Sequence, residues 1–212
     1  MKNFSRPCWA SIALTFVLLL GSCAGNKPVM PSYEGQDFRS ALSSMKRVSD
    51  IETRFSIVFE KNDSEIRGDG ALDISNGGDM SLRIYSLGFL AMEMTSVDGV
   101  VKSSPRLDRN KTLILTQGLR DCLFWWDMKD FTLDEDTENF VLRNSERELW
   151  ISKKSFLPVK QKLYFDDGRM LMVYYDEPAF ENGSWYQSKI RIELARYSVK
   201  LNIKNMAFKQ QS

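Results

Sequence analysis

The stretch MSLRIYSLGFLAMEMTSVDG, residues 80–99, alternates apolar and polar side chains twice, with a Leu87-Gly88 pair between its two halves. An alternation of period two is typical of a β-strand with one buried face. Because only a short turn separates the halves, the stretch predicts an antiparallel hairpin. The apolar faces of the two strands are formed by Met80, Leu82 and Ile84 and then by Leu90, Met92 and Met94.

The same period extends along most of the chain in both directions. Short turns such as Asn76-Gly77-Gly78-Asp79 and Asp166-Asp167-Gly168 separate the apolar-polar runs. Sequential strands joined by short turns pair with one another, so the sequence predicts a meandering antiparallel sheet of about ten or eleven strands. The strands are expected at about 53–60, 65–76, 80–85, 90–95, 100–103, 139–144, 147–153, 158–166, 169–176, 185–195 and 198–207.

Two segments have helical periodicity instead. Residues 34–50 carry an apolar stripe at spacings of three and four, which predicts a helix near the N-terminus. Residues 113–126 have a similar stripe in mid-chain, and Gly118 is a point at which this helix can divide. Two helical segments cannot cover a flat sheet of this size. We therefore expect a mainly β (α+β) fold, with a strongly curved sheet and the helices in its mouth.

Near the N-terminus, an apolar run ends at a cysteine, in the stretch LTFVLLLGSCAGN, residues 14–26. The uncharged segment is too short for a bilayer-spanning helix, which needs about 20 residues. With its basic start it is typical of a secretory signal. Leu20-Gly21-Ser22-Cys23 resembles the lipobox of bacterial lipoproteins, in which cleavage precedes a lipidated cysteine; an ordinary secretory signal is the alternative. The resemblance implies a signal peptide at 1–22 and lipid attachment at Cys23. The small and polar residues that follow predict a flexible tether at 23–33, and the length of the remainder suits one domain at 34–212.

The composition argues against several functional classes. The sequence contains no histidine, which removes the usual general base and the usual zinc ligand. Removal of residues 1–22 leaves 27 basic and 28 acidic side chains, and no basic cluster that would indicate nucleic-acid binding. Cys122 is predicted to be a small core residue, and an acidic cluster, Asp134 to Glu138, is predicted to be a solvated turn. We expect no catalytic residue, metal site or cofactor. No set of residues in the sequence supports the alternative of an enzyme, such as a carboxylate-dependent hydrolase.

Three stretches carry a resemblance to a known family. MSLRIYSLGFLAMEMTSVDG is similar to a family strand–turn–strand with a Leu-Gly pair, SFLPVKQKLYFDDGRMLMVYY (155–175) to a late hairpin, and SKIRIELARYSVKLNIKNM (188–206) to the closing strand pair. The chain thereby resembles the periplasmic lipoprotein carrier LolA and the outer-membrane lipoprotein receptor LolB. This resemblance implies an unclosed antiparallel β-barrel of about eleven strands that holds acyl chains under a mid-chain helical lid.

The resemblance also implies a set of site residues. Leu87 matches a leucine that inserts into lipid, and Phe89 and Leu90 lie beside it. A turn buried in the domain itself is the alternative interpretation. Apolar side chains, including flexible methionines, are candidates for the cavity lining, although ordinary core packing uses the same residue types. They are Phe55, Phe59, Leu82, Ile84, Met92, Met94, Leu119, Trp125, Trp126, Phe165, Met172 and Tyr174.

The expected function is therefore binding rather than catalysis. We expect an outer-membrane lipoprotein, on the periplasmic face, that binds acyl chains and acts in lipoprotein reception and insertion or in lipid transport. Its expected partners are the membrane, through lipidated Cys23, acylated lipoproteins or another lipid, and a periplasmic carrier protein; the chain itself is expected to be a monomer. In the sorting rule of enteric lipoproteins, an Asp after the lipidated Cys favours retention in the inner membrane; Ala24 at this position therefore implies the outer membrane. The alternative is a non-enzymatic accessory lipoprotein that scaffolds an envelope protein complex.

Overall fold

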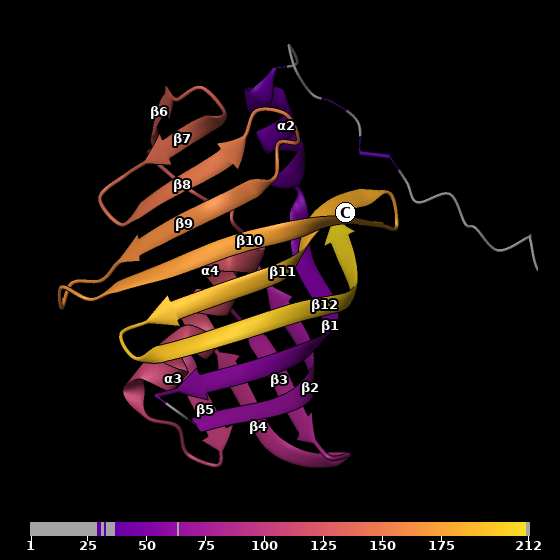
Figure 1. Ribbon diagram of the computed structural model, residues 1–212, viewed down its shortest axis with the longest axis vertical. Coiled ribbons are helices and arrows are strands. Elements are labelled where there is room, and N and C mark those ends of the chain that lie inside the picture. The colour runs from indigo at the N-terminus through magenta and orange to yellow at the C-terminus, as the bar shows by residue number, and fades with distance from the viewer. Residues whose placement is uncertain (1–28, 31, 33–36, 63, 211–212) are drawn as a thin grey trace, which may run out of the picture.

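The computed structural model describes residues 29–30, 32, 37–62 and 64–210, and its centre is one curved antiparallel sheet (Figure 1). The sheet has twelve strands in the order β5-β4-β3-β2-β1-β12-β11-β10-β9-β8-β7-β6, and its edges β5 and β6 do not pair. The predicted mainly β, unclosed fold is confirmed. The strands are β1 (Val48–Lys61), β2 (Ser64–Ser75), β3 (Met80–Ser86), β4 (Phe89–Val97), β5 (Val100–Ser104), β6 (Thr132–Glu135), β7 (Asn139–Arg143), β8 (Arg147–Ser152), β9 (Pro158–Tyr164), β10 (Met170–Glu181), β11 (Ser184–Leu194) and β12 (Tyr197–Gln210).

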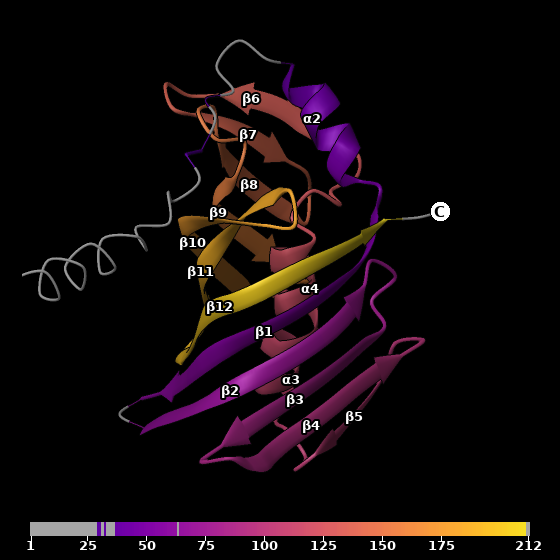
Figure 2. The same ribbon diagram turned by 90° about the vertical axis from the view of Figure 1, so that its right-hand side faces the viewer.

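The order of the strands determines where the mid-chain segment runs. The chain builds five strands outward from the centre, then returns from the opposite edge with seven more, so that β1 and β12 pair in the middle. In this central ladder Phe55 is opposite Ile203 and Ile57 is opposite Leu201. Because β5 and β6 lie at opposite edges, the residues between them have to cross the sheet. Figure 2 shows that they do so along its concave face.

The crossing segment is a continuous helix, which we call the lid, made of α3 (Arg109–Leu113), a π-helical turn η1 (Ile114–Gly118) and α4 (Leu119–Leu123). The predicted mid-chain helix is thus confirmed, and it does not divide at Gly118. A β-carbon on Gly118 would lie 3.2 Å from Leu171 Cδ1 and 3.6 Å from Ile192 Cγ2. The glycine therefore allows the helix axis to approach β10 and β11 closely.

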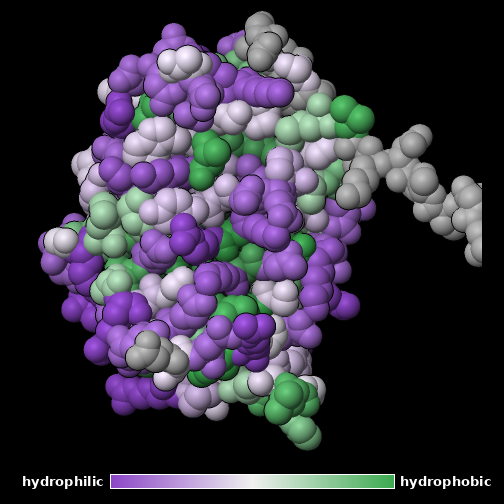
Figure 3. Space-filling model, in the orientation of Figure 1, coloured by the Kyte–Doolittle hydropathy of each residue, from purple (hydrophilic) through white to green (hydrophobic). Residues whose placement is uncertain are grey.

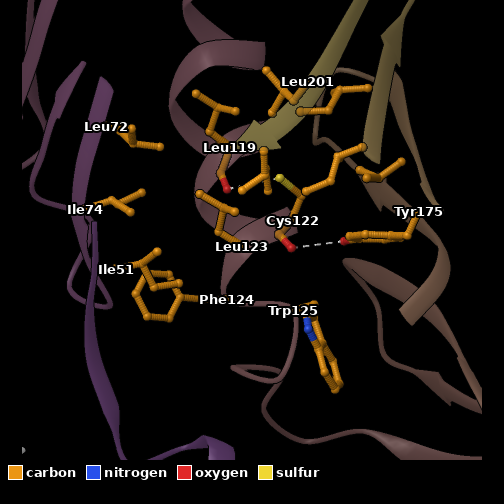
Figure 4. Packing of buried hydrophobic residues seen from close by; sticks show 14 of the residues in the cluster. Ile51, Leu72, Ile74, Leu119, Cys122, Leu123, Phe124, Trp125, Tyr175 and Leu201 are labelled. Atoms are coloured by element: carbon orange, nitrogen blue, oxygen red, sulfur yellow. Dashed lines mark hydrogen bonds between the residues drawn. The ribbon is translucent and has the colours of Figure 1, made fainter. Parts of the chain in front are cut away.

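The lid fills most of the concave side with its own side chains. Figure 4 shows Leu119 and Leu123 pointing between Leu72 and Ile74 on one side and Leu201 on the other. All of these side chains are buried in one continuous hydrophobic cluster that also includes residues of every strand from β7 to β12. The burial of apolar surface by the lid is the main force that holds it to the sheet.

The N-terminal helix is shorter than predicted. Asp37 caps α2 (Phe38–Met45), because its carboxylate accepts hydrogen bonds from the backbone N–H groups of Arg39 and Ser40 at 3.1 and 3.2 Å. The Phe38 ring stacks on Phe140 of β7 at 4.5 Å between centroids. The prediction of helix to residue 50 is wrong. Pairing with β12 continues to Val48, and this ladder prevails over the helical spacing.

One strand has no counterpart in the sequence prediction. The acidic cluster at 134–138 was expected to be a turn, but Asp134 and Glu135 belong to edge strand β6, which pairs with β7. Asp136 does form the following turn, where its carboxylate accepts from the backbone N–H of Asn139 at 2.7 Å. Because β6 is short, exposed and charged, its sequence lacks the apolar-polar alternation from which a strand is predicted.

The predicted signal peptide, Cys23 and most of the tether lie outside the described residues. Within the part of the chain that the structure describes, no helix is long and apolar enough to cross a bilayer.

Candidate functional site

The turn between β3 and β4 has an unusual residue for its backbone geometry. Leu87 and Gly88 both have positive φ, 51° and 83°, as a two-residue hairpin of this hand requires. Leucine is disfavoured in the left-handed region, whereas asparagine and aspartate tolerate it. The chain obeys this preference in two other hairpin turns with closely similar φ values, Asp98-Gly99 and Asn182-Gly183. At Leu87 the chain therefore retains an apolar side chain where folding alone favours a polar one.

Leu87 belongs to an exposed apolar group, which we call the tip: Ile66, Leu87, Phe89 and Leu90. Their exposed fractions are 58%, 95%, 77% and 53%. Ile66 joins the group from β2, where the carbonyl of the next residue, Arg67, accepts a hydrogen bond from Ser86 at 3.2 Å. Figure 3 shows hydrophobic side chains protruding at the lower end of the molecule, where the β3–β4 hairpin lies in Figure 1. The alternative of a buried turn is therefore excluded.

An apolar cavity of about 180 Å³ opens beside the tip. Ile66 belongs to both the tip and the cavity wall, and Leu90 of the tip is followed by the lining residue Ala91. The apolar surface is thus continuous from the turn into the interior. The wall is formed by Ile57, Phe59, Ile66, Arg67, Gly68, Ile84, Ala91, Met92, Pro105, Leu107, Lys111 and Leu115.

The size of this cavity limits what it holds while the lid is in place. A cavity of about 150 Å³ accepts a benzene-sized molecule. A volume of about 180 Å³ therefore accommodates the terminal part of an acyl chain, but not the whole chain. Beyond this cavity the lid packs into the hydrophobic core of the sheet, so a longer chain that extends in that direction requires the lid to move.

The structure brings only part of the predicted lining together. Phe59, Ile84 and Met92 line the cavity. Four others lie in the packed core with at most 1% of their surface exposed: Phe55, Leu82, Met94 and Leu119. Phe55 is placed there by Gly70, since a β-carbon on this glycine would lie 2.3 Å from the Phe55 ring.

Three further predicted residues line other hollows. Trp125 and Trp126 line a small cavity of about 20 Å³ at the opposite end of the lid, which has room for about one water molecule. Phe165 lines an open cleft of about 590 Å³ outside the first turn of the lid.

The prediction for Met172 and Tyr174 is wrong, because both lie on the outer face of β10. They alternate with Leu171, Val173 and Tyr175, which are buried against the lid side. The Tyr174 ring instead packs under the Arg191 guanidinium, with 4.5 Å between Cζ and the ring centroid. The run MLMVYY is apolar at every position, so its sequence does not reveal which face is internal.

Sequence reasoning also missed several cavity residues. Ile57 and Leu115 were assigned to regular elements without a site role, and Pro105 and Leu107 precede the lid in a segment with no periodicity. Lys111 was missed because a charged residue in a helix usually faces solvent. The available signal for it was its place one helical turn before Leu115.

Charged groups hold the first turn of the lid. The Asp108 carboxylate caps it, accepting from the Lys111 backbone N–H at 3.0 Å and from the Tyr197 hydroxyl at 3.1 Å. Burial raises the pKa of Asp108, but these two hydrogen bonds outweigh burial, so the pKa lies below its usual value. Nearby, Asp167 pairs with Arg169 at 2.6 Å and with Arg109 of the lid at 3.1 Å. The hydrogen bonds from Arg169 lower the pKa of Asp167 to about 2.

A buried ion pair holds the last turn. Asp121 is only 2% exposed, and its Oδ1 lies 2.7 Å from Arg147 Nη2 on β8 and 2.9 Å from Arg120 Nη1. Arg120 also donates to the Asn76 carbonyl at 2.9 Å, in the turn after β2. The lid is thus tied to both halves of the sheet at its C-terminal end.

The buried titratable groups are unsuited to nucleophilic chemistry. Burial raises the pKa of the Cys122 thiol above its ordinary value, which keeps it protonated. Burial also raises the pKa of Tyr175, whose hydroxyl donates to Gln161 Oε1 at 2.6 Å. Figure 4 shows the same hydroxyl facing the Cys122 carbonyl. These groups stabilise the contact between lid and sheet.

The fold is similar to those of several solved structures. The LolA superfamily protein of Nitrosomonas europaea superposes with a TM-score of 0.53, at 13% identity over 82% of this chain and 94% of that one. The chain has the LolA-type fold. A DUF1329-family protein of Desulfovibrio piger also superposes on it, with a TM-score of 0.57, 12% identity and coverage of 85% and 94%. The predicted resemblance is confirmed at the level of the fold.

Comparison at the sequence level adds no relative. No protein-family model matches the chain, and no curated protein matches it significantly. At such low identities the LolA-type fold specifies the scaffold but not the ligand.

Proposed function

We propose that this protein is a non-enzymatic lipid-binding protein of the bacterial envelope, which exchanges acyl chains with a membrane through the tip. The observation that carries the proposal is the continuity of an exposed apolar turn, in strained backbone, with an apolar cavity. Exposed leucine and phenylalanine are unfavourable in water and favourable in lipid. The tip is suited to enter the membrane, and the cavity to receive the end of a chain drawn from it.

The energy for uptake comes from the hydrophobic effect. Each methylene removed from water contributes about 0.8 kcal/mol. The cavity wall is mostly aliphatic and aromatic, and the thioether of Met92 adapts readily to the shape of a flexible chain. Displacement of the lid would expose the remaining apolar concave face, which can accept the rest of the chain.

Anchoring is a separate part of the proposal. Residues 1–22 serve as a signal peptide, and Cys23 carries the lipid that holds the protein at the outer membrane, on its periplasmic face. Two or more acyl chains anchor a protein stably, whereas one does so only marginally. Residues 23–33 are the tether that lets the single domain turn its tip toward the membrane. In this role the protein receives acylated lipoproteins, or another lipid, from a periplasmic carrier.

A vesicle transfer assay tests the proposal. Pyrene-labelled phospholipid in donor vesicles should move to acceptor vesicles faster when the purified protein is present. The variants Leu87→Asn and Phe89→Ser should slow this transfer by roughly tenfold or more, since each removes a large apolar side chain from the membrane contact. Val97→Ser, a matched exposed residue at the opposite end of β4, should transfer lipid at the wild-type rate. Unchanged transfer by the tip variants would exclude the mechanism.

A second candidate function is supported by the edge of the sheet. Strand β5 ends the sheet on one side, and its Val100 and Val101 are exposed. An unpaired apolar edge can accept a strand from a protein partner, as expected of an accessory scaffold. A copurifying partner that is retained by the tip variants and lost on Val101→Pro would favour this function over lipid exchange.

A further inference from the structure

Within the described part of the chain, the charged residues on the wall of the apolar cavity beside the tip are all basic. Ten of its lining residues are uncharged, and the other two are Arg67 and Lys111. None of the residues that line it, among those that the structure describes, carries a carboxylate. Lys111 is partly exposed and Arg67 is exposed, so the two cations lie at the boundary between the apolar wall and the solvent.

Lys111 is the more constrained of the two cations. Its backbone N–H donates to the Asp108 carboxylate at 3.0 Å. Its side chain lines the cavity, and Nζ lies over the Phe59 ring, 5.3 Å from the ring centroid. Among the described residues Lys111 forms no ion pair, so its ammonium group keeps its hydrogen-bond donors available. The carboxylate of Asp108, which precedes α3, accepts the hydrogen bonds of the helix cap and of the Tyr197 hydroxyl.

Arg67 offers a second, exchangeable cation. Its side chain is 76% exposed, and among the described residues it pairs with the carboxylate of Glu65, which is 39% exposed on the same strand. An exposed pair of this kind contributes little net stability. The guanidinium can therefore leave Glu65 for an anionic group at the cavity mouth.

We propose, building on the proposed acyl-binding function, that this cavity selects an acyl chain that ends in a carboxylate, that is, a free fatty acid. The alkyl end occupies the wall formed by Ile57, Ile84 and Leu115, and the carboxylate accepts charge-assisted hydrogen bonds from Lys111 and Arg67. A chain that ends in a neutral ester would fill the same wall but leave the ammonium group of Lys111 without a partner.

Calorimetric titration of the full-length protein with decanoate and with methyl decanoate tests the inference. The two ligands share their alkyl chain and differ in charge. The wild type should bind decanoate roughly tenfold more tightly, as expected for a hydrogen bond to a charged group. Lys111→Gln should reduce the preference for decanoate over the ester severalfold, with Arg67 supplying the remainder, and Lys111→Arg should restore most of the preference. Lys102→Gln, an exposed lysine of β5 outside the cavity, is the matched control and should behave as the wild type.

Each other outcome overturns the inference in a recognisable way. Equal affinity of the wild type for both ligands would reject the carboxylate and leave the acyl-binding function standing. A preference for decanoate that is undiminished in Lys111→Gln would assign the recognition of charge to other groups. Equal loss of both ligands in that variant would show that the lysine supports the cavity and does not recognise charge. Binding of neither ligand by the wild type would reject both this inference and the proposed function.

Discussion

One exposed leucine, Leu87, lowers the stability of this fold. Leu87 has a φ of 51° and is 95% exposed, so it gains no burial and adopts a backbone conformation that costs leucine about 1–2 kcal/mol. Leu87→Asn should therefore raise the free energy of unfolding, by about 0.5–1 kcal/mol, because asparagine tolerates this conformation. Urea denaturation should give a higher midpoint with an unchanged slope.

The two polar turns of the same geometry provide the control for this residue. Asp98→Leu places leucine at a φ of 50° in the next hairpin and should lower stability by a similar amount. If Leu87→Asn destabilised the protein instead, the side chain would have a structural role. The case for a functional tip would then lose its basis.

At the scale of elements, the lid depends on a buried ion pair at its C-terminal end. Asp121 on α4 lies 2.7 Å from Arg147 on β8, and both are buried. Asp121→Asn leaves a buried arginine without its carboxylate, which costs about 3 kcal/mol. Chemical denaturation should show this loss. Asp127→Asn removes the more exposed partner of Arg120 and should cost less than about 1 kcal/mol; equal effects would contradict the assignment.

The other end of the lid should respond to acid. Arg169 holds the pKa of Asp167 at about 2, below the ordinary value of 3.8, so the ionised carboxylate favours the folded state. This contribution is complete above about pH 4 and is lost as the pH falls toward about 2. The variant Asp167→Asn should flatten the decline in thermal midpoint across that window. Asp166→Asn, which changes the neighbouring carboxylate without removing these contacts, should keep the wild-type profile.

The sequence predicted elements well where one face alternates. Strands such as β3 and β4 follow their apolar period closely, and the lid follows its helical stripe. Prediction failed where two physical signals competed or none existed. Val48 continues a helical stripe but is paired with β12, β6 is too polar to alternate, and β10 is apolar on both faces. Only tertiary contacts decide these cases.

At the scale of the molecule, the site depends on how completely the lid fills the sheet. The sequence suggested a hollow too large for its own side chains, but the lid packs into the core and leaves an apolar cavity of about 180 Å³ beside the tip and an open cleft outside its first turn. This outcome could not be predicted, because it depends on how closely the helix approaches the sheet. Gly118 against Leu171 sets that approach, and an isolated glycine in a helical pattern does not reveal what it touches.

The residual cavity implies a characteristic dependence on ligand length. In a series of saturated fatty acids, affinity should rise by about 0.8 kcal/mol per methylene while the chain fills the existing space. It should then level off where the lid blocks further entry, and rise again only in chains long enough to displace the lid. Hydrogen exchange distinguishes the two regimes: short ligands should leave the amides of residues 109–123 protected, whereas long ligands should expose them. Asp121→Asn should shift the onset to shorter chains, because the lid is then held less firmly. A smooth rise over all lengths with unchanged protection of the lid would mean that chains bind elsewhere, on the outer surface of the sheet.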